Sequence, residues 1–213
     1  MMARSSWFRR TPPLTLYGRR VALRPLGVDD FRAYREVRRR NADWLLPWEP
    51  LRSPTLPDPT TDRSAFEHRC SIRHRDIQLD HAYAFGLFVG DRFAGEVNLT
   101  QVIRGATQSG TIGYWIDRDL AGHAYVAEGV AVLMAYAFDA LNLHRLEICI
   151  VPRNHRSRRV VDKLGLRNEG TAQSFLEING VREDHVRYAI TSTEWAERRD
   201  DLIDRWIGGS TSA

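Results

Sequence analysis

The chain has 213 residues and a formal net charge of +4, and 43% of its residues are hydrophobic. This length supports one sizeable core, and the apolar content is that of a globular protein. No apolar run reaches the roughly 18–20 residues of a membrane span, and the first residues lack the apolar segment of a secretion signal. The composition therefore predicts a cytoplasmic protein, with Cys70 and Cys149 as reduced thiols.

The N-terminal part is predicted to be a loose arm followed by a strand and a helix. Residues 1–13 carry several arginines before Pro12-Pro13, which is typical of a basic arm. Residues 14–26 alternate well enough for a strand that bends at 17–20. A helix is expected to open at Val28, with one apolar stripe formed by Phe31, Tyr34 and Val37.

Residues 41–59 are punctuated by proline and are expected to form an ordered loop, because proline disrupts both helices and central strands. A helix is predicted near 61–80. Three strand-like runs joined by short turns then predict an antiparallel meander. These runs are 83–89, 93–102 and 110–117.

The stretch from Gly113 to Tyr125 leads from an apolar strand through a glycine-containing turn into a long helix. Free N–H groups at such a turn converge on one point, and the helix dipole adds positive charge there. The turn is therefore suited to a pyrophosphate. The helix is predicted to stop near Asn142, and its apolar stripe consists of Val126, Val130, Leu133, Met134, Ala137, Phe138 and Leu141.

A second strand-to-helix connection follows. Residues 145–151 are rich in β-branched side chains and lead into Asn154 and Ser157, where a shorter helix is expected to begin. Gly165 can end that helix in a left-handed conformation. Ser157 is open to two interpretations, an N-cap of this helix or a functional hydroxyl.

The C-terminal part predicts a closing hairpin and a last helix. Asn179-Gly180 is a strong hairpin signal. Residues 208–213 are expected to fray, and no repeat or second domain is visible, so 14–207 is predicted to be one domain. The elements expected here are strands at 175–178 and 185–190 and a helical segment that holds Trp195 and Trp206.

These motifs, in this order, resemble the GNAT superfamily of acetyl-CoA-dependent N-acetyltransferases, and in particular its RimJ/RimL branch of ribosomal-protein alanine and serine N-acetyltransferases. The resemblance covers roughly residues 15–191. It implies an α/β (α+β) fold with a mixed, mostly antiparallel sheet, splayed near the coenzyme and flanked by helices. The motifs are Gly113-Tyr-Trp-Ile, Leu120-Ala-Gly-His-Ala, Leu143-His-Arg-Leu-Glu, Asn154-x-x-Ser157 and Leu164-Gly-Leu.

The resemblance also implies how acetyl-CoA, the cosubstrate, binds. The pantetheine arm pairs like an extra strand with the backbone of Tyr114, Trp115 and Ile116, and Asn154 binds its amides. The pyrophosphate rests on the turn formed by Gly122, His123, Ala124, Tyr125 and Val126. No metal is expected, because the seven histidines show no ligand spacing.

One residue departs from the family pattern. Asp119 stands where arginine or glutamine usually begins the turn, and a carboxylate aimed at a pyrophosphate would repel it. We expect Asp119 to point outward, with the neighbouring Arg118 compensating its charge.

Acetyl transfer needs a neutral amine and a proton for the departing thiolate. The resemblance implies that Ser157 is the general acid. Glu177 is the predicted general base, since strand alternation places Leu176 and Ile178 on the opposite face. The alternatives that remain open are Glu96, Asp184, His185 and an ordered water.

The predicted reaction is acetyl transfer from acetyl-CoA to the α-amine of a protein N-terminus, such as that of a ribosomal protein. Trp44 and Trp48 are interpreted either as core anchors or as walls of the acceptor groove. The arginines are spread along the chain, so neither membrane association nor direct nucleic-acid binding is expected. The alternatives are acetylation of a small amine, such as an antibiotic or a polyamine, and a non-catalytic acyl-CoA-sensing module.

Overall fold

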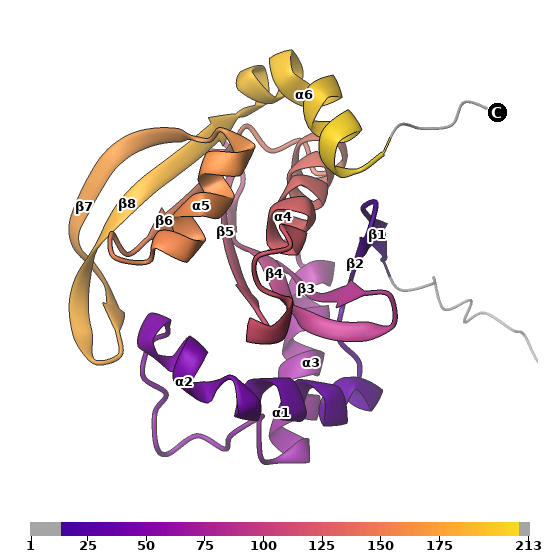
Figure 1. Ribbon diagram of the computed structural model, residues 1–213, viewed down its shortest axis with the longest axis vertical. Coiled ribbons are helices and arrows are strands. Elements are labelled where there is room, and N and C mark those ends of the chain that lie inside the picture. Colours follow the sequence, from indigo (N-terminus) through magenta and orange to yellow (C-terminus); the bar gives the residue numbers. More distant parts are fainter. Residues whose placement is uncertain (1–13, 209–213) are drawn as a thin grey trace, which may run out of the picture.

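The computed structural model describes residues 14–208, which form an eight-stranded sheet flanked by helices (Figure 1). The strand order is β1-β2-β3-β4-β5-β6-β8-β7, and every neighbouring pair is antiparallel except β5 and β6. The predicted arm at 1–13 and residues 209–213 of the predicted tail lie outside the described residues. The strands are β1 (Leu16–Tyr17), β2 (Val21–Arg24), β3 (Tyr83–Val89), β4 (Arg92–Ile103), β5 (Ser109–Ile116), β6 (Arg145–Ile150), β7 (Arg167–Ile178) and β8 (Val181–Thr191).

Helices cover both faces of the sheet (Figure 1). The α-helices are α1 (Phe31–Arg40), α2 (Ala42–Leu45), α3 (Arg63–Gln78), α4 (Tyr125–Ala135), α5 (His155–Leu164) and α6 (Ser192–Trp206). The shorter helical turns are η1 (Val28–Asp30), η2 (Leu46–Trp48) and η3 (Arg118–Leu120), and the π-helical turn η4 (Tyr136–Ala140) continues α4.

Two hydrophobic cores form because successive strand residues point to opposite faces. Leu87 belongs to the larger core, which contains the buried stripe of α4, whereas the next residue, Phe88, belongs to the smaller one. The smaller core takes Tyr34 from α1 and Phe66 from α3. The sheet is therefore held between α4 on one face and the α1–α3 pair on the other.

The sheet splays between β5 and β6. These parallel strands pair only from Ser109 opposite Arg145 to Thr111 opposite Glu147, while β5 stays paired with β4 as far as Ile116. A parallel pair needs a crossover connection, and α4 supplies it. Beyond Thr111, the β5 backbone consequently has no strand partner on its β6 side.

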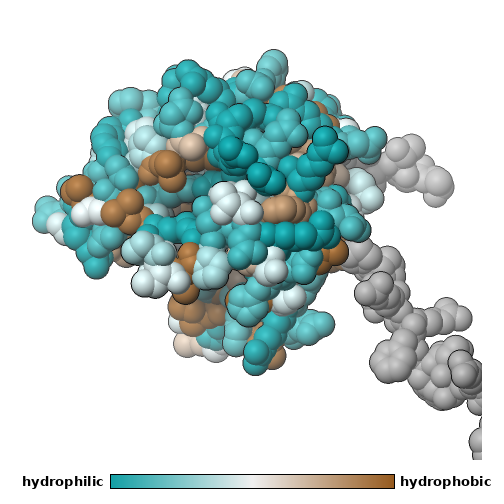
Figure 2. Space-filling view, turned by 90° about the horizontal axis from the view of Figure 1, so that it is seen from below, coloured by the Kyte–Doolittle hydropathy of each residue, from teal (hydrophilic) through white to brown (hydrophobic). Residues whose placement is uncertain are grey.

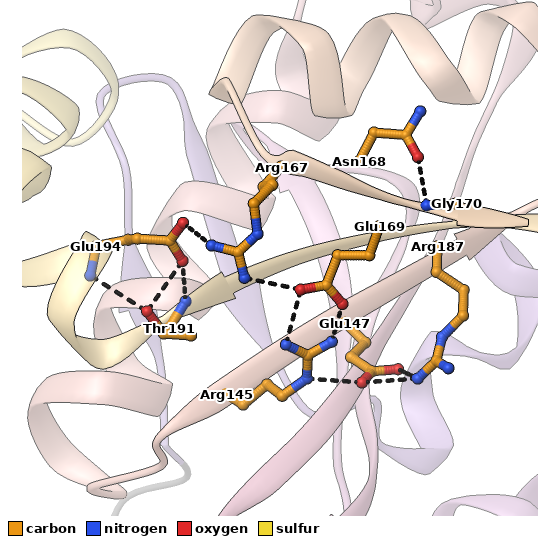
Figure 3. Close-up of polar contacts among 9 residues, drawn as sticks. All are labelled: Arg145, Glu147, Arg167, Asn168, Glu169, Gly170, Arg187, Thr191 and Glu194. Carbon is orange, nitrogen blue, oxygen red and sulfur yellow. Dashed lines mark hydrogen bonds and ion pairs between the residues drawn. The ribbon is translucent and has the colours of Figure 1, made fainter.

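The strands beyond the divergence of β5 and β6 form a C-terminal arm of β6, β8 and β7. Charged side chains link these strands to one another (Figure 3). Arg145 on β6 bonds Glu147 on the same strand and Glu169 on β7, and Arg187 on β8 bonds Glu147 at 2.8 Å. Arg167 links Glu169 to α6 by its ion pair with Glu194. Because these groups are partly exposed, we expect the network to orient the arm more than to stabilise it.

Most of the predicted elements are confirmed, including the end of the long helix near Asn142, and two predictions need correction. The segment 41–59 is not a loop throughout, because α2 and η2 lie within it. Proline is compatible with η2 because Pro47 sits in its first turn. The closing strands are longer than predicted, reaching 167–178 and 181–191. The long helix ends as a π-helical turn before Asn142. Cys70 and Cys149 are free thiols, as predicted.

Candidate active site

A cavity of about 880 Å³ opens where β5 and β6 diverge, a volume within the usual range for small-molecule sites. Its walls come mainly from four segments: the α2–η2 region, the end of β5, the turn before α4, and one side of α5. The residues of these segments that line it are Trp44, Leu45, Trp48, Glu49, Pro50, Gly113, Tyr114, Trp115, Ile116, Leu120, Ala121, Gly122, Ala124, Tyr125, Val126, Ala127, Asn154, Arg156, Ser157, Arg159, Val160 and Lys163.

The turn before α4 is built to receive an anion. Gly122 has φ +89° and Ala124, the N-cap of α4, has φ +64°, a left-handed conformation that few non-glycine residues adopt. No side chain caps this helix end. Its first N–H groups therefore remain available at the positive end of the helix dipole, which fits the coenzyme pyrophosphate.

The turn is held in place from outside the cavity. Glu128, 1% exposed on α4, accepts hydrogen bonds from the backbone N–H of Val21 and from Arg20 Nε at 2.8 Å. Arg20 Nη1 in turn donates to the carbonyl of His123 at 3.2 Å. His123 does not line the cavity, and its ring stacks on Tyr125 with 5.6 Å between centroids.

We call residues 120–126 the phosphate turn. Asp119 does not line the cavity, so it points away from this turn as predicted. The predicted compensation by Arg118 is wrong, because Arg118 lies 3.4 Å from Asp43 instead. Asp119 Oδ2 lies 3.6 Å from Arg92 Nη2 and 3.9 Å from Arg40 Nε. Both arginines belong to long-range contacts that no local sequence pattern reveals.

We expect the native protein to bind acetyl-CoA with a Kd in the micromolar range and Asp119→Arg to tighten binding by no more than about threefold, because exposed charge pairs contribute under about 1 kcal/mol. Titration calorimetry measures both values. Asp29→Arg makes the same charge change at an exposed position outside the cavity and serves as the control. Absence of binding by the native protein, with recovery in Asp119→Arg, would contradict this placement.

Buried polar groups join the end of β5 to the start of α2. Asp117, fully buried, accepts hydrogen bonds from Asn41 Nδ2 at 2.8 Å and Arg92 Nη2 at 2.7 Å and is also paired with Arg40. These donors lower the pKa of Asp117 to about 2, against the effect of burial. Trp44 Nε1 adds a 3.2 Å bond to the carbonyl of Ile116. The α2 wall is therefore fixed to the strand that leads into the phosphate turn.

Trp44 and Trp48 line the cavity, and both are half-buried outside the two cores. Of the two interpretations of these residues, the structure favours cavity walls over core anchors.

Ser157 lies in the cavity beside Tyr114. Its Oγ donates to Tyr114 Oη at 3.0 Å, and the Tyr114 hydroxyl donates to the Ser157 carbonyl at 3.0 Å. Burial raises the pKa of Tyr114 above its usual value, so the phenol stays protonated. The N-cap interpretation of Ser157 is wrong: Asn154 caps α5 by accepting from the Ser157 N–H at 3.1 Å.

The predicted general base, Glu177, and the alternatives Asp184 and His185 do not reach the cavity. Glu177 is exposed on β7, opposite Arg182 in the ladder. Asp184 Oδ1 accepts from the backbone N–H of Ser174 at 2.8 Å, and the buried His185 ring contacts the carbonyl of Glu183. None of the three lines the cavity.

Glu96, another alternative for the general base, is held outside the cavity by other side chains. It is 2% exposed and accepts from Arg69, Arg73 and the indole Nε1 of Trp115, at 2.7, 2.8 and 3.1 Å. Within residues 14–208, Glu49 is the one carboxylate lining the cavity, and both its oxygens bond Arg38 at 2.6 Å.

Sequence reasoning missed Asn98 and the cationic side of α5. Asn98 interrupts an apolar strand, which was a visible signal; it lines the cavity and accepts from the Phe85 N–H at 3.1 Å. Arg156, Arg159 and Lys163 follow the three-and-four spacing of one helix face and also line the cavity. Within residues 14–208, no group of three or more metal-ligating side chains comes together, and no helix has the length and apolar character to cross a membrane.

Comparisons with known proteins agree with this geometry. The sequence-family model of the acetyltransferase (GNAT) domain matches residues 20–167. The chain is 35% identical to the probable N-acetyltransferase YjcK of Bacillus subtilis, covering 84% of this chain and 98% of the relative. It is 30% identical to the [ribosomal protein uS5]-alanine N-acetyltransferase of Escherichia coli, covering 75% and 81%.

Among solved structures, RimJ of Mycobacterium smegmatis in complex with CoA-disulfide superposes with a TM-score of 0.83 at 28% identity, covering 91% of this chain and 95% of RimJ. The ribosomal-protein-S5-alanine acetyltransferase of Vibrio fischeri gives 0.76 at 26% identity, covering 85% and 98%. The chain belongs to the GNAT acetyltransferase family and is an acetyl-CoA-dependent acetyltransferase.

Proposed function

We propose that this enzyme acetylates the α-amine of a protein N-terminus, with ribosomal proteins as the candidate acceptors. The observation that carries the proposal is one continuous cavity that runs from the phosphate turn, past Ser157, to the wall formed by Trp44 and Trp48. The ribosomal-protein alanine acceptors in the names of the relatives from Escherichia coli and Vibrio fischeri support a ribosomal-protein acceptor.

The chain's own groups have separable roles in this proposal. The backbone of residues 113–116 on the side that faces β6 aligns the pantetheine arm, and the first N–H groups of α4 hold the pyrophosphate. Ser157 gives its hydroxyl proton to the departing thiolate and regains a proton from the water that deprotonates the amine, and Tyr114, whose hydroxyl oxygen accepts from Ser157 Oγ, positions the serine. No unpaired carboxylate lines the described cavity. Water therefore takes the proton from the acceptor amine in this proposal.

The surface beside the cavity suits a peptide. Figure 2 shows a largely hydrophilic face on which hydrophobic side chains form separate spots. Exposed apolar residues lie both in the segment after α2 and at the tip of the β7–β8 hairpin, and the two are joined where the Asn179 N–H donates to the Glu49 carbonyl at 2.8 Å. These exposed residues are Leu46, Leu51, Leu56, Phe175, Leu176 and Val181.

An acceptor screen tests the function. Release of free coenzyme A thiol is followed with peptides that begin with Ala, Ser or Met, and with a polyamine and an aminoglycoside at equal concentration. The proposal predicts turnover with at least one peptide above both small amines. Turnover with small amines alone would replace it with the small-amine function, and tight acetyl-CoA binding without thiol release from any acceptor would favour the sensing module.

Trp48→Ala should raise the acceptor KM by about tenfold while the Kd for acetyl-CoA stays nearly constant, because loss of a contact made equally in ground and transition states raises KM. Steady-state kinetics and titration calorimetry give the two constants. Losses of similar size for both ligands, with a lower Tm, would show that Trp48 supports the fold instead. Trp206→Phe, a change in the buried core, is the control for general destabilisation.

A further inference from the structure

A second, smaller cavity adjoins the first at the start of α5. Its volume is about 300 Å³. Its lining consists of Trp48, Arg153, Asn154, His155, Arg156 and Arg159. Trp48, Asn154, Arg156 and Arg159 also line the larger cavity, so the two cavities lie side by side.

The lining of the smaller cavity is positively charged, and most of that charge is not neutralised. None of its lining residues is acidic. Arg153 is paired with Glu183 on β8, whereas Arg156 and Arg159 form neither an ion pair nor a side-chain hydrogen bond with any residue in the described part of the chain. The positive end of the α5 dipole adds to the potential here.

Two of the arginines are oriented by aromatic rings. The guanidinium carbon of Arg156 lies 4.5 Å from the ring centroid of Trp44, and that of Arg153 lies 5.0 Å from the ring centroid of Trp48. Arg153 bonds Glu183 with its edge, whereas the edge N–H groups of Arg156 stay free and match carboxylate or phosphate oxygens in a forked geometry. The cavity is therefore preorganised for an anion.

The position of the cavity indicates which ligand carries that anion. Trp48 contributes from the proposed acceptor wall and Asn154 from the pantetheine side, whereas no residue of the turn at 120–126 lines the smaller cavity. The coenzyme pyrophosphate therefore has its own site, and the additional anion belongs on the acceptor side.

We propose that the smaller cavity is an anion subsite of the acceptor site, and that the preferred acceptor is an N-terminal segment with a carboxylate in its first few residues. The proposal rests on the proposed function, because it specifies the class of N-terminus that is acetylated. Arg156 and Arg159 determine this specificity by bonding the acceptor carboxylate.

The test compares isosteric peptides, Ala-Asp-Ala-Ala with Ala-Asn-Ala-Ala and Ala-Ala-Asp-Ala with Ala-Ala-Asn-Ala. Their binding to the protein saturated with coenzyme A is measured by titration calorimetry. We expect the Asp member of at least one pair to bind about tenfold more tightly, the size of one charge-assisted hydrogen bond. The preference should shrink as salt is raised, because the arginines are exposed.

The doubly substituted variant Arg156→Gln, Arg159→Gln should bind the Asp and Asn peptides equally. Arg75→Gln, which removes an exposed charge on α3 far from both cavities, should keep the preference. Equal binding of Asp and Asn peptides by the native protein would overturn the subsite.

In the remaining experiment, the binding of coenzyme A is compared with that of dephospho-coenzyme A, for the native protein and for the double variant. If the double variant lost the discrimination between these two and kept the Asp preference, the arginines would serve the 3′-phosphate and the proposal would be overturned. Failure of the proposed function is distinguishable, because it shows as absence of acetylation of every peptide, whereas peptide binding is read without turnover.

Discussion

Ser157→Ala is expected to lower kcat by about 10²–10⁴-fold, the usual contribution of a general acid, while the Kd for acetyl-CoA changes by less than about twofold. Ser157 Oγ lies in the cavity and bonds only Tyr114 Oη among the described side chains. The fold should be little affected, because Asn154 rather than Ser157 caps α5. Initial rates, titration calorimetry and thermal unfolding measure the three quantities.

Asn154→Ala is the matched control, because it removes the cap and leaves the hydroxyl. Loss of an N-cap costs about 1 kcal/mol of the free energy of unfolding. Since Asn154 also lines the cavity, its variant should bind acetyl-CoA less tightly, a pattern opposite to that of Ser157→Ala. Near-normal turnover of Ser157→Ala would show that Ser157 is not the general acid.

Glu96→Gln is expected to lower the free energy of unfolding by about 3–5 kcal/mol at pH 7, because it removes one partner of a buried ion-pair cluster. The variant leaves Arg69 and Arg73 without their counter-charge beneath α3. Urea unfolding measures the change. Glu67→Gln breaks an exposed pair with Arg63 by the same substitution and should cost under about 0.5 kcal/mol.

The cost of Glu96→Gln should also depend on pH. The arginines lower the pKa of Glu96 from 4.5 to about 2 despite its burial. Because the unfolded chain takes up this proton at higher pH than the native one, the stabilisation is complete above the unfolded pKa and is lost as pH falls from about 4.5 towards 2. The stability difference between native protein and variant should therefore shrink over this interval, and a constant difference would contradict the assignment.

Local patterns were sufficient for the elements that frame the site. The stripe from Val126 to Phe138 marked the helix that packs on the sheet, and Asn179-Gly180 marked the hairpin turn. The glycine-containing turn at Gly122 indicated an uncapped helix start, because positive φ angles and helix capping are local properties. These features depend on neighbours within a few residues.

Side-chain environments at the hairpin could not be predicted in the same way. Alternation places Leu176 and Ile178 on one face, yet Leu176 is 42% exposed and Ile178 is 5% exposed. The register of β7 shifts between Ala172 and Leu176, and Ser174 takes a positive φ of 47°. A bulge turns the following side chains, so counting from the strand start cannot tell where Glu177 points.

Long-range polar partners were equally hidden. Asp117 bonds residues 76 and 25 positions away, Asn41 and Arg92, and this cluster rather than Arg118 sets the surroundings of Asp119. Only the folded sheet brings α1 and the end of β5 together. The cavity wall at α2 and the turn before α4 are thus joined by contacts that no local motif encodes.

Tandem mass spectrometry of the product determines whether this GNAT enzyme transfers acetyl to the α-amine of a peptide N-terminus. The substrate is a peptide that begins with Ala or Ser and carries one internal lysine, incubated with the enzyme and acetyl-CoA. We expect a single added acetyl group on the first residue, with an unmodified lysine side chain. Acetylation of the lysine alone, or an unmodified peptide under conditions where the protein binds acetyl-CoA, would contradict this expectation.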